Sequence, residues 1–370
     1  MDVADDEDRD VTAPEIIRPA GPFDPGGTGA GAGRPARAQD VARAAGVSTA
    51  TVSRAFNAPE KVAPAVRDRV LEVAAALGWL PHPAGAALAK RRTAIAGVVI
   101  PNLGQEVFAF QVEAMQAAFA ERGITLLIGC ANYDPAEAVR QTRAMLARGV
   151  EALAVVGESQ ADGFFEMIKA RRVPYVVTYG YRADSPHPSV GFDNRDAFRV
   201  ITRHLLDLGH QSFGVILQPM DNNDRVAQRL AGVRETLAGQ GLGLRPGDLR
   251  EGRADIAFGR ESLRAMMEGP APRPTAIICG TDLLAVGALL EARALGLRIP
   301  EDLSVTGFDD IALAAEFDPP LTTMRVDCAG IGRLAAGHLL ARLEGIATPG
   351  KIAIIPSFIA RGTTASAPRR

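Results

Sequence analysis

Four side chains between residues 49 and 54 have the types and the spacing to face the major groove of DNA from one helix. Thr49, Ala50 and Ser53 are short, and Arg54 carries a guanidinium group. An arginine is the side chain best matched to guanine in the major groove, whereas threonine and alanine offer hydroxyl and methyl contacts. A helix whose outer side chains are short can lie deep in the groove. The pattern therefore indicates a DNA-reading helix.

The residues around this stretch have the spacing of a helix-turn-helix. In the run QDVARAAGVSTATVSRAFN, Ala42 is small enough for a second helix to cross closely, Gly46 can adopt the positive φ of a tight turn, and Val52 fills the core between the helices. Ser48 stands where the second helix needs an N-cap. Any two amphipathic helices joined by a glycine share part of this pattern. We expect helices at about 39–45, 49–56 and 64–77.

The composition is that of a globular protein with two or three domains. The chain has 370 residues, of which 47% are hydrophobic and 23% charged. No window approaches the ~18 consecutive apolar residues of a membrane span, and the acidic N-terminus does not have the pattern of a secretory signal. We therefore expect a cytoplasmic protein that does not bind a membrane. The cysteines and histidines have no metal-ligand spacing, so neither a metal nor a cofactor is expected.

Charge is distributed unevenly along the chain. Residues 1–33 hold eight acidic and two basic side chains, whereas residues 34–92 hold ten basic and four acidic ones. A basic module beside a nearly neutral body is the electrostatic footprint of a DNA-binding head, because phosphate contacts supply most non-specific affinity. The acidic, Gly/Pro-rich tail, residues 1–37, has too few apolar side chains to offset its ordering entropy and is predicted to be disordered.

Several stretches together resemble the lactose-repressor/galactose-repressor (LacI/GalR) family of bacterial transcription regulators. They are DVARAAGVSTATVSRAFN, the basic amphipathic helix after it, and LGWLPHPAGAALAKRR, and the likeness continues to about residue 365. The resemblance implies a helix-turn-helix domain at 38–78, a hinge at 79–92 and a two-lobed effector-binding and dimerisation domain at 93–370.

The same resemblance assigns roles in DNA binding. Thr49, Ala50 and Arg54 would read bases, and the remaining polar residues would hold phosphates: Ser48, Thr51, Ser53 and Asn57. In the family a hinge leucine of each subunit wedges into the minor groove, and the matching residue is Leu88. A plain linker with a basic run is the alternative interpretation of the hinge.

From Thr93 onward, short apolar runs alternate with amphipathic stretches, which predicts parallel sheets built from βαβ units. Strands are expected at 95–100, 124–129, 152–156, 175–179, 212–217, 275–280 and 303–308. Helices are expected near 107–122, 135–148, 160–171, 194–208, 225–240, 258–268 and 282–295.

The predicted fold is therefore α/β, an all-α head followed by a two-lobed body. This body resembles the periplasmic sugar-binding proteins, which bind a ligand between lobes at the carboxyl ends of the strands. The first lobe is placed at about 93–192 and 325–350, and the second at about 193–320 and 351–365.

By resemblance, Arg229 matches an arginine that grips the effector from the second lobe, and Asp309 matches an aspartate that accepts hydrogen bonds from hydroxyl groups. Without the resemblance, the sequence is equally consistent with Arg229 as a solvent-exposed residue of a helix. The other expected ligand-binding residues are Asn102, Phe108, Tyr133, Tyr179 and Asp282. An arginine opposite a carboxylate suits a polyhydroxylated ligand, and the arginine would pair with an acid group on it.

Two features narrow the expected effector. Tyr179 falls near a position where some relatives have an aspartate for sugar hydroxyls, which makes a simple hexose less suitable. The segments ANYDP, residues 131–135, and VGFDN, residues 190–194, look most like the gluconate-operon regulators of the family. The expected effector is therefore a sugar or a sugar acid.

No catalytic constellation is present. The run GESQA at residues 157–161 lacks the second glycine of a nucleophile elbow, and DNND at residues 221–224 lacks the glycine and distal glutamate of a calcium loop. Both are expected to be surface loops. We therefore predict a homodimeric repressor that binds double-stranded operator DNA under control of the effector, and not an enzyme. The alternative is a solute-binding protein or an enzyme on the same α/β body without a DNA role.

Overall fold

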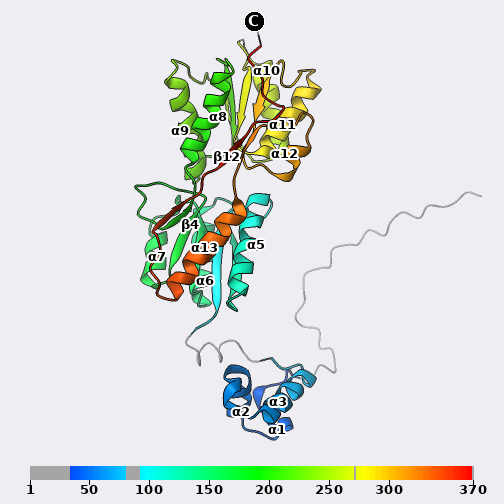
Figure 1. The fold of residues 1–370 in the computed structure, drawn as a ribbon, viewed down its shortest axis with the longest axis vertical. Coiled ribbons are helices and arrows are strands. Elements are labelled where there is room, and N and C mark those ends of the chain that lie inside the picture. The colour runs from blue at the N-terminus through cyan, green and yellow to red at the C-terminus, as the bar shows by residue number, and fades with distance from the viewer. Residues whose placement is uncertain (1–33, 81–91, 271, 369–370) are drawn as a thin grey trace, which may run out of the picture. The chain divides into compact units, whose positions relative to one another are not determined.

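The computed structural model describes residues 34–80, 92–270 and 272–368, which belong to a small head and a larger body (Figure 1). The two compact units meet in the sequence between His82 and Pro83, and each is described by itself. The predicted acidic tail up to residue 33 and most of the predicted hinge, with Leu88, lie outside the described residues.

The head is a helical unit around one small apolar core. Gly46 follows the first helix with φ +65°, in the left-handed region that glycine adopts without strain. Ser48 Oγ caps the second helix by accepting the backbone N–H of Thr51 at 3.1 Å. The predicted helix ends agree to within one residue. The elements are α1 (Ala38–Ala45), α2 (Thr49–Asn57), η1 (Pro59–Lys61) and α3 (Pro64–Ala76).

The apolar core of the head extends past the predicted domain boundary. Val41, Val52 and Val70 are fully buried at its centre. Trp79 packs against this core, and its ring meets that of Phe56 edge-on with centroids 5.4 Å apart. Trp79 therefore belongs to the head by its packing, although the sequence analysis placed it in the hinge.

The first lobe of the body is built on a six-stranded parallel sheet with the order β11-β5-β4-β3-β1-β2. Its strands alternate their side chains between two covered faces, so that Val98 and Val99 enter different cores. The strands are β1 (Ile95–Ile100), β2 (Thr125–Cys130), β3 (Ala152–Val156), β4 (Tyr175–Thr178), β5 (Ser189–Gly191) and β11 (Lys351–Ala353).

Helices cover both faces of this sheet. On the face of Val98 lie α5 (Glu106–Ala120) and α13 (Cys328–Leu343). On the face of Val99 lie α6 (Pro135–Ala147) and α7 (Phe164–Ala170).

The second lobe repeats this plan on a four-stranded parallel sheet with the order β7-β6-β8-β9. The strands are β6 (Phe213–Leu217), β7 (Leu249–Glu251), β8 (Ala276–Cys279) and β9 (Ser304–Thr306). One face packs on α8 (Asn194–Asp207) and α9 (Asp224–Ala238), and the other on α10 (Ile256–Glu268) and α11 (Asp282–Ala294). The short helix α12 (Ala312–Glu316) follows β9.

The chain crosses between the lobes three times. It first leaves β5 for α8, then returns through β10 (Thr323–Arg325) to α13, and finally leaves β11 through β12 (Ser357–Ile359). The antiparallel pair β10–β12 joins the last two crossings (Figure 1). The assignment of residues 351–365 to the second lobe was partly wrong, because β11 pairs with β5 in the first sheet. Within the described ranges, no helix is long and apolar enough to cross a membrane.

Candidate functional site

The outer face of α2 presents four of the side chains predicted to contact DNA. Thr49, Ala50, Ser53 and Arg54 are exposed, whereas Val52 is buried beneath them. Among residues 34–80, no hydrogen bond or ion pair engages the guanidinium group of Arg54. Its donors are therefore available to a partner such as guanine.

The predicted phosphate-holding side chains lie along the same helix. Ser48 Oγ lies 3.0 Å from Thr51 Oγ1 while it caps the helix, and Asn57 Nδ2 donates to Ser53 Oγ at 3.3 Å. The free N–H groups and the dipole at the start of a helix favour an anion such as phosphate. One helix and its cap therefore carry every predicted DNA-binding residue of the described head.

Five of the seven predicted ligand-binding side chains line a single pocket between the two lobes: Phe108, Tyr133, Tyr179, Arg229 and Asp309. The free volume of this cavity is about 20 Å³. That is room for about one water molecule, whereas sites for small organic ligands measure roughly 300–1,000 Å³. A sugar can therefore enter only if the lobes move apart.

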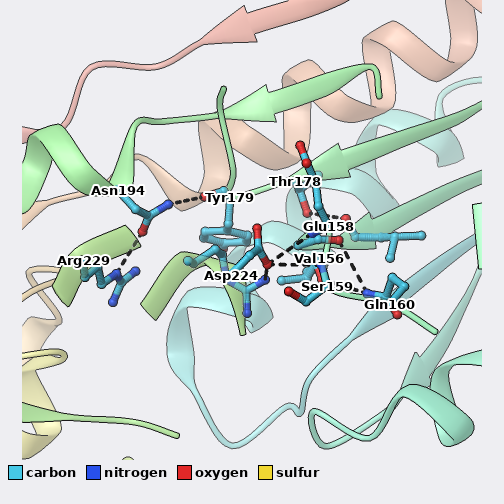
Figure 2. Close-up of polar contacts among 12 residues, drawn as sticks. Val156, Glu158, Ser159, Gln160, Thr178, Tyr179, Asn194, Asp224 and Arg229 are labelled. Atoms are coloured by element: carbon cyan, nitrogen blue, oxygen red, sulfur yellow. Dashed lines mark hydrogen bonds and ion pairs between the residues drawn. The ribbon is translucent and has the colours of Figure 1, made fainter. Parts of the chain in front are cut away.

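Arg229 reaches the pocket from α9 and is held by contacts that cross between elements (Figure 2). Its Nε donates to Asn194 Oδ1 at 2.9 Å and its Nη1 to the carbonyl oxygen of Gly280 at 2.7 Å. The guanidinium carbon lies 4.1 Å from the centroid of the Phe308 ring. Burial lowers the pKa of Arg229 to about 10, so the side chain stays charged at neutral pH.

Asp309 faces the same pocket in an unusual backbone conformation. Its φ is +112°, which is strained for a residue with a side chain and is typical of functional positions. Burial raises the pKa of its carboxyl group, and the charge of Arg229 opposes this rise. Within the described body, no hydrogen bond engages this carboxyl group. It is therefore free to accept hydrogen bonds from a ligand.

Two buried amides that the sequence analysis did not single out also line the pocket. Gln218 Oε1 and Asn223 Oδ1 are buried oxygens without a hydrogen-bond partner among the described residues. Buried acceptors are almost always satisfied in native proteins, so these two atoms indicate where donors of a ligand would bind. Gln218 directly follows β6, and that position at a strand end was the signal that could have found it.

The two segments expected to be surface loops contact each other across the lobes. Asp224 Oδ1, at the start of α9, accepts the backbone N–H groups of Glu158 at 3.2 Å and Ser159 at 3.4 Å (Figure 2). Arg225, whose side chain is only 7% exposed, packs on Gly157, where an added Cβ would lie 2.0 Å from its Nη1. Both segments are loops with partly exposed residues, as expected, but local polarity does not reveal which loops meet when two lobes approach.

Asn102 and Asp282 do not line this pocket. Asn102 Oδ1 accepts the backbone N–H of Gln105 at 3.1 Å, just before α5. Asp282 accepts Thr323 Oγ1 at 2.6 Å and the backbone N–H of Ile311 at 2.8 Å, and burial raises its pKa to about 6. The two carboxylate oxygens of Asp282 thus bind β10 and the loop after β9. Asp282 therefore stabilises segments next to the pocket without lining it.

A helix-turn-helix head and a two-lobed α/β body with a polar pocket define a DNA-binding protein that responds to a ligand. The family model described as "Bacterial regulatory proteins, lacI family" matches residues 38–82, and that described as "Periplasmic binding protein-like domain" matches residues 202–364. The HTH-type transcriptional regulator MalR of Streptomyces coelicolor is 32% identical over 345 residues, which are 90% of this chain and 97% of MalR. The chain belongs to the LacI family of transcription regulators and is not an enzyme.

Solved structures agree with this assignment. The lac repressor dimer bound to operator and the anti-inducer ONPF is 27% identical, with a TM-score of 0.78 over 90% of this chain and 100% of that one. The CelR–cellobiose complex is 27% identical, with a TM-score of 0.65 over 89% of this chain and 99% of that one. Across the described ranges, no group of three or more histidine, cysteine, aspartate or glutamate residues is placed to hold a metal ion.

Proposed function

We propose that this regulator is a homodimeric repressor whose operator binding is controlled by a sugar acid in the pocket between its lobes. The charge of the pocket lining is the observation that supports this class of ligand. Arg225 and Arg229 are both in the lining, and Asp309 is the single acidic side chain there. The surplus positive charge favours a ligand that brings a carboxylate of its own.

Arg225 is the better candidate for binding that carboxylate. The guanidinium of Arg229 is already engaged by Asn194 and Gly280, whereas the ion pair of Arg225 with Asp224 has a long separation of 4.0 Å. The hydroxyl groups of the ligand would donate to Asp309, Gln218 and Asn223. Sugar acids have this combination of groups, and the likeness of residues 131–135 and 190–194 to gluconate-operon regulators favours the same class.

Two aromatic rings in the pocket lining offer apolar contacts to the carbon skeleton of such a ligand. Phe108 and Tyr179 meet edge-on with ring centroids 5.3 Å apart, and Tyr179 is anchored by its hydroxyl group, which donates to the carbonyl oxygen of Val107 at 2.5 Å. Apolar faces next to polar acceptors are the usual lining of sites for small organic ligands.

Control of DNA binding would follow from the change in lobe separation that the ligand requires. A ligand that prefers one separation shifts the population toward it, with a coupling free energy of typically ~1–3 kcal/mol. In the proposed homodimer the two hinges then pair differently, and the Leu88 side chains enter or leave the minor groove at the operator centre. The dimer is supported by the likeness to the lac repressor, which was solved as a dimer bound to operator.

Calorimetric titration with D-gluconate and D-glucose tests the ligand class, because the two compounds differ mainly in the acid group. We expect gluconate or a related aldonate to bind at least about tenfold more tightly than glucose, as for a charge-assisted pair. Arg225→Gln should remove this preference, whereas Arg250→Gln, outside the pocket on β7, should keep it. Equal binding of the neutral sugar, or an unchanged preference in Arg225→Gln, would overturn the proposal.

A further inference from the structure

A second cavity lies on the first lobe and shares no residue with the pocket between the lobes. Its volume is about 460 Å³, so it is large enough for a small organic molecule. Its walls come from the end of α7, the loop before β4, the last turns of α13 and the loop before β11. Three cations, Lys169, Arg172 and Arg342, line it, and none of its lining residues is acidic.

Acidic side chains of the protein itself compete little with a ligand for these three cations. Among the described residues, neither Arg172 nor Arg342 forms an ion pair. Lys169 meets only Glu166, at 3.8 Å, and both side chains are more than half exposed. A solvent-exposed pair of this kind contributes little and is readily exchanged for a better partner.

Two buried polar groups in the same cavity lack partners. His338 is 6% exposed, and its Nδ1 has no hydrogen-bond partner among the described residues. Thr348 Oγ1 is likewise buried and unpartnered in the described part of the chain. Such atoms are uncommon in native proteins and need an explanation. Because burial and the nearby Arg342 lower the pKa of His338, its ring is neutral at pH 7 and carries one N–H donor.

We propose that this cavity binds the phosphoryl group of a small phosphorylated metabolite. Arginine side chains match the geometry of phosphate oxygens, and a phosphate monoester carries the negative charge that the lining lacks. The hydroxyl group of Thr348 and the ring of His338 add neutral donors deeper in the cavity. The remaining volume accommodates the organic part of the ester, which bare phosphate would leave unused.

Histidine side-chain NMR spectra of the full chain test this site, because the protein has only five histidines. The chain is titrated with inorganic phosphate and with phenyl phosphate, each against sodium chloride at matched ionic strength. We expect the His338 ring signals to shift with a saturable dependence on both phosphates but not on chloride, and phenyl phosphate to bind more tightly. Equal effects of chloride and phosphate would overturn the proposal.

Amino-acid substitutions distinguish a specific phosphate site from non-specific attraction of anions. Arg342→Ala and Arg172→Ala should each weaken phosphate binding about tenfold, as expected for the loss of a charge-assisted hydrogen bond. Arg333→Ala, on the exposed side of the same helix, should bind as the parent does. Thr348→Val keeps the charges and should weaken binding more modestly. Phosphate binding that is unchanged in both arginine variants, or weakened equally by Arg333→Ala, would contradict the site.

Discussion

Replacing Asp224 with alanine should loosen the contact that joins the two lobes at the ligand pocket. The carboxylate accepts two backbone N–H groups of the other lobe, from Glu158 at 3.2 Å and Ser159 at 3.4 Å, and its side chain is 19% exposed. Hydrogen bonds to charged groups contribute about 1.5–3 kcal/mol each. Because these two are long and partly solvated, we expect a combined loss of about 2 kcal/mol in the closed arrangement. This corresponds to a shift of about 30-fold toward separated lobes.

Amide hydrogen exchange of the segment containing residues 158 and 159 reports the loss of this contact between the lobes. In Asp224→Ala these amides should exchange at least about 30-fold faster than in the parent, because Asp224 is their hydrogen-bond acceptor and their protection requires the closed arrangement. Asp196→Ala is the matched control, since Asp196 is an exposed acidic residue in the first turn of α8 and lies in the same lobe. Unchanged exchange in Asp224→Ala, or equal acceleration in both variants, would refute this reasoning.

Three other substitutions test the ligand pocket and the stability of the body. Arg229→Ala should abolish the ligand response and lower the free energy of unfolding by about 3 kcal/mol, because it leaves the buried Asp309 without its counter-charge; a normal ligand response would contradict the assigned role. The pKa of Asp282 is raised to about 6 from an ordinary value of 3.8, so the folded state holds a proton that the unfolded state releases. The parent should therefore lose about 2 kcal/mol of stability relative to Asp282→Asn as the pH rises from 4 to 7, in urea titrations at each pH; a constant difference would show that folding does not raise the pKa of this carboxyl group. Gly259→Ala should destabilise the second lobe by about 1–3 kcal/mol in thermal unfolding, since its Cβ would lie 2.3 Å from the carbonyl oxygen of Leu284; an unaltered midpoint would mean that α10 and α11 separate freely.

Elements with a strong local pattern could be predicted from the sequence. Ala42, Gly46 and Val52 specify the head because their sizes fit one helix crossing, and every expected strand and helix of the body is present within four residues of its predicted ends. Helix α13 was not predicted, because its sequence is apolar on most sides and the helical spacing of its buried residues does not stand out from it. Strand β11 was not predicted, and its residues were assigned to the second lobe, because three residues contain no information about the sheet that they join.

The pocket was predictable only in part. Arg229 and Asp309 came from a family likeness, and the structure places them in one pocket. Asp282 follows a strand as a ligand-binding acid would, but its partners Thr323 and Ile311 come from segments 41 and 29 residues away. Such long-range partners cannot be found from local sequence.

Operator binding by the full chain tests most directly whether a ligand between the lobes controls the head. Fluorescence anisotropy would follow labelled DNA from the region upstream of the gene, at two salt concentrations, with and without D-gluconate. The account predicts tight, salt-sensitive binding that the sugar acid shifts, and a loss of about 1–3 kcal/mol in operator affinity for Arg54→Ala with unchanged thermal stability. Affinity no greater than for scrambled DNA under every condition, or full operator affinity in Arg54→Ala, would contradict it.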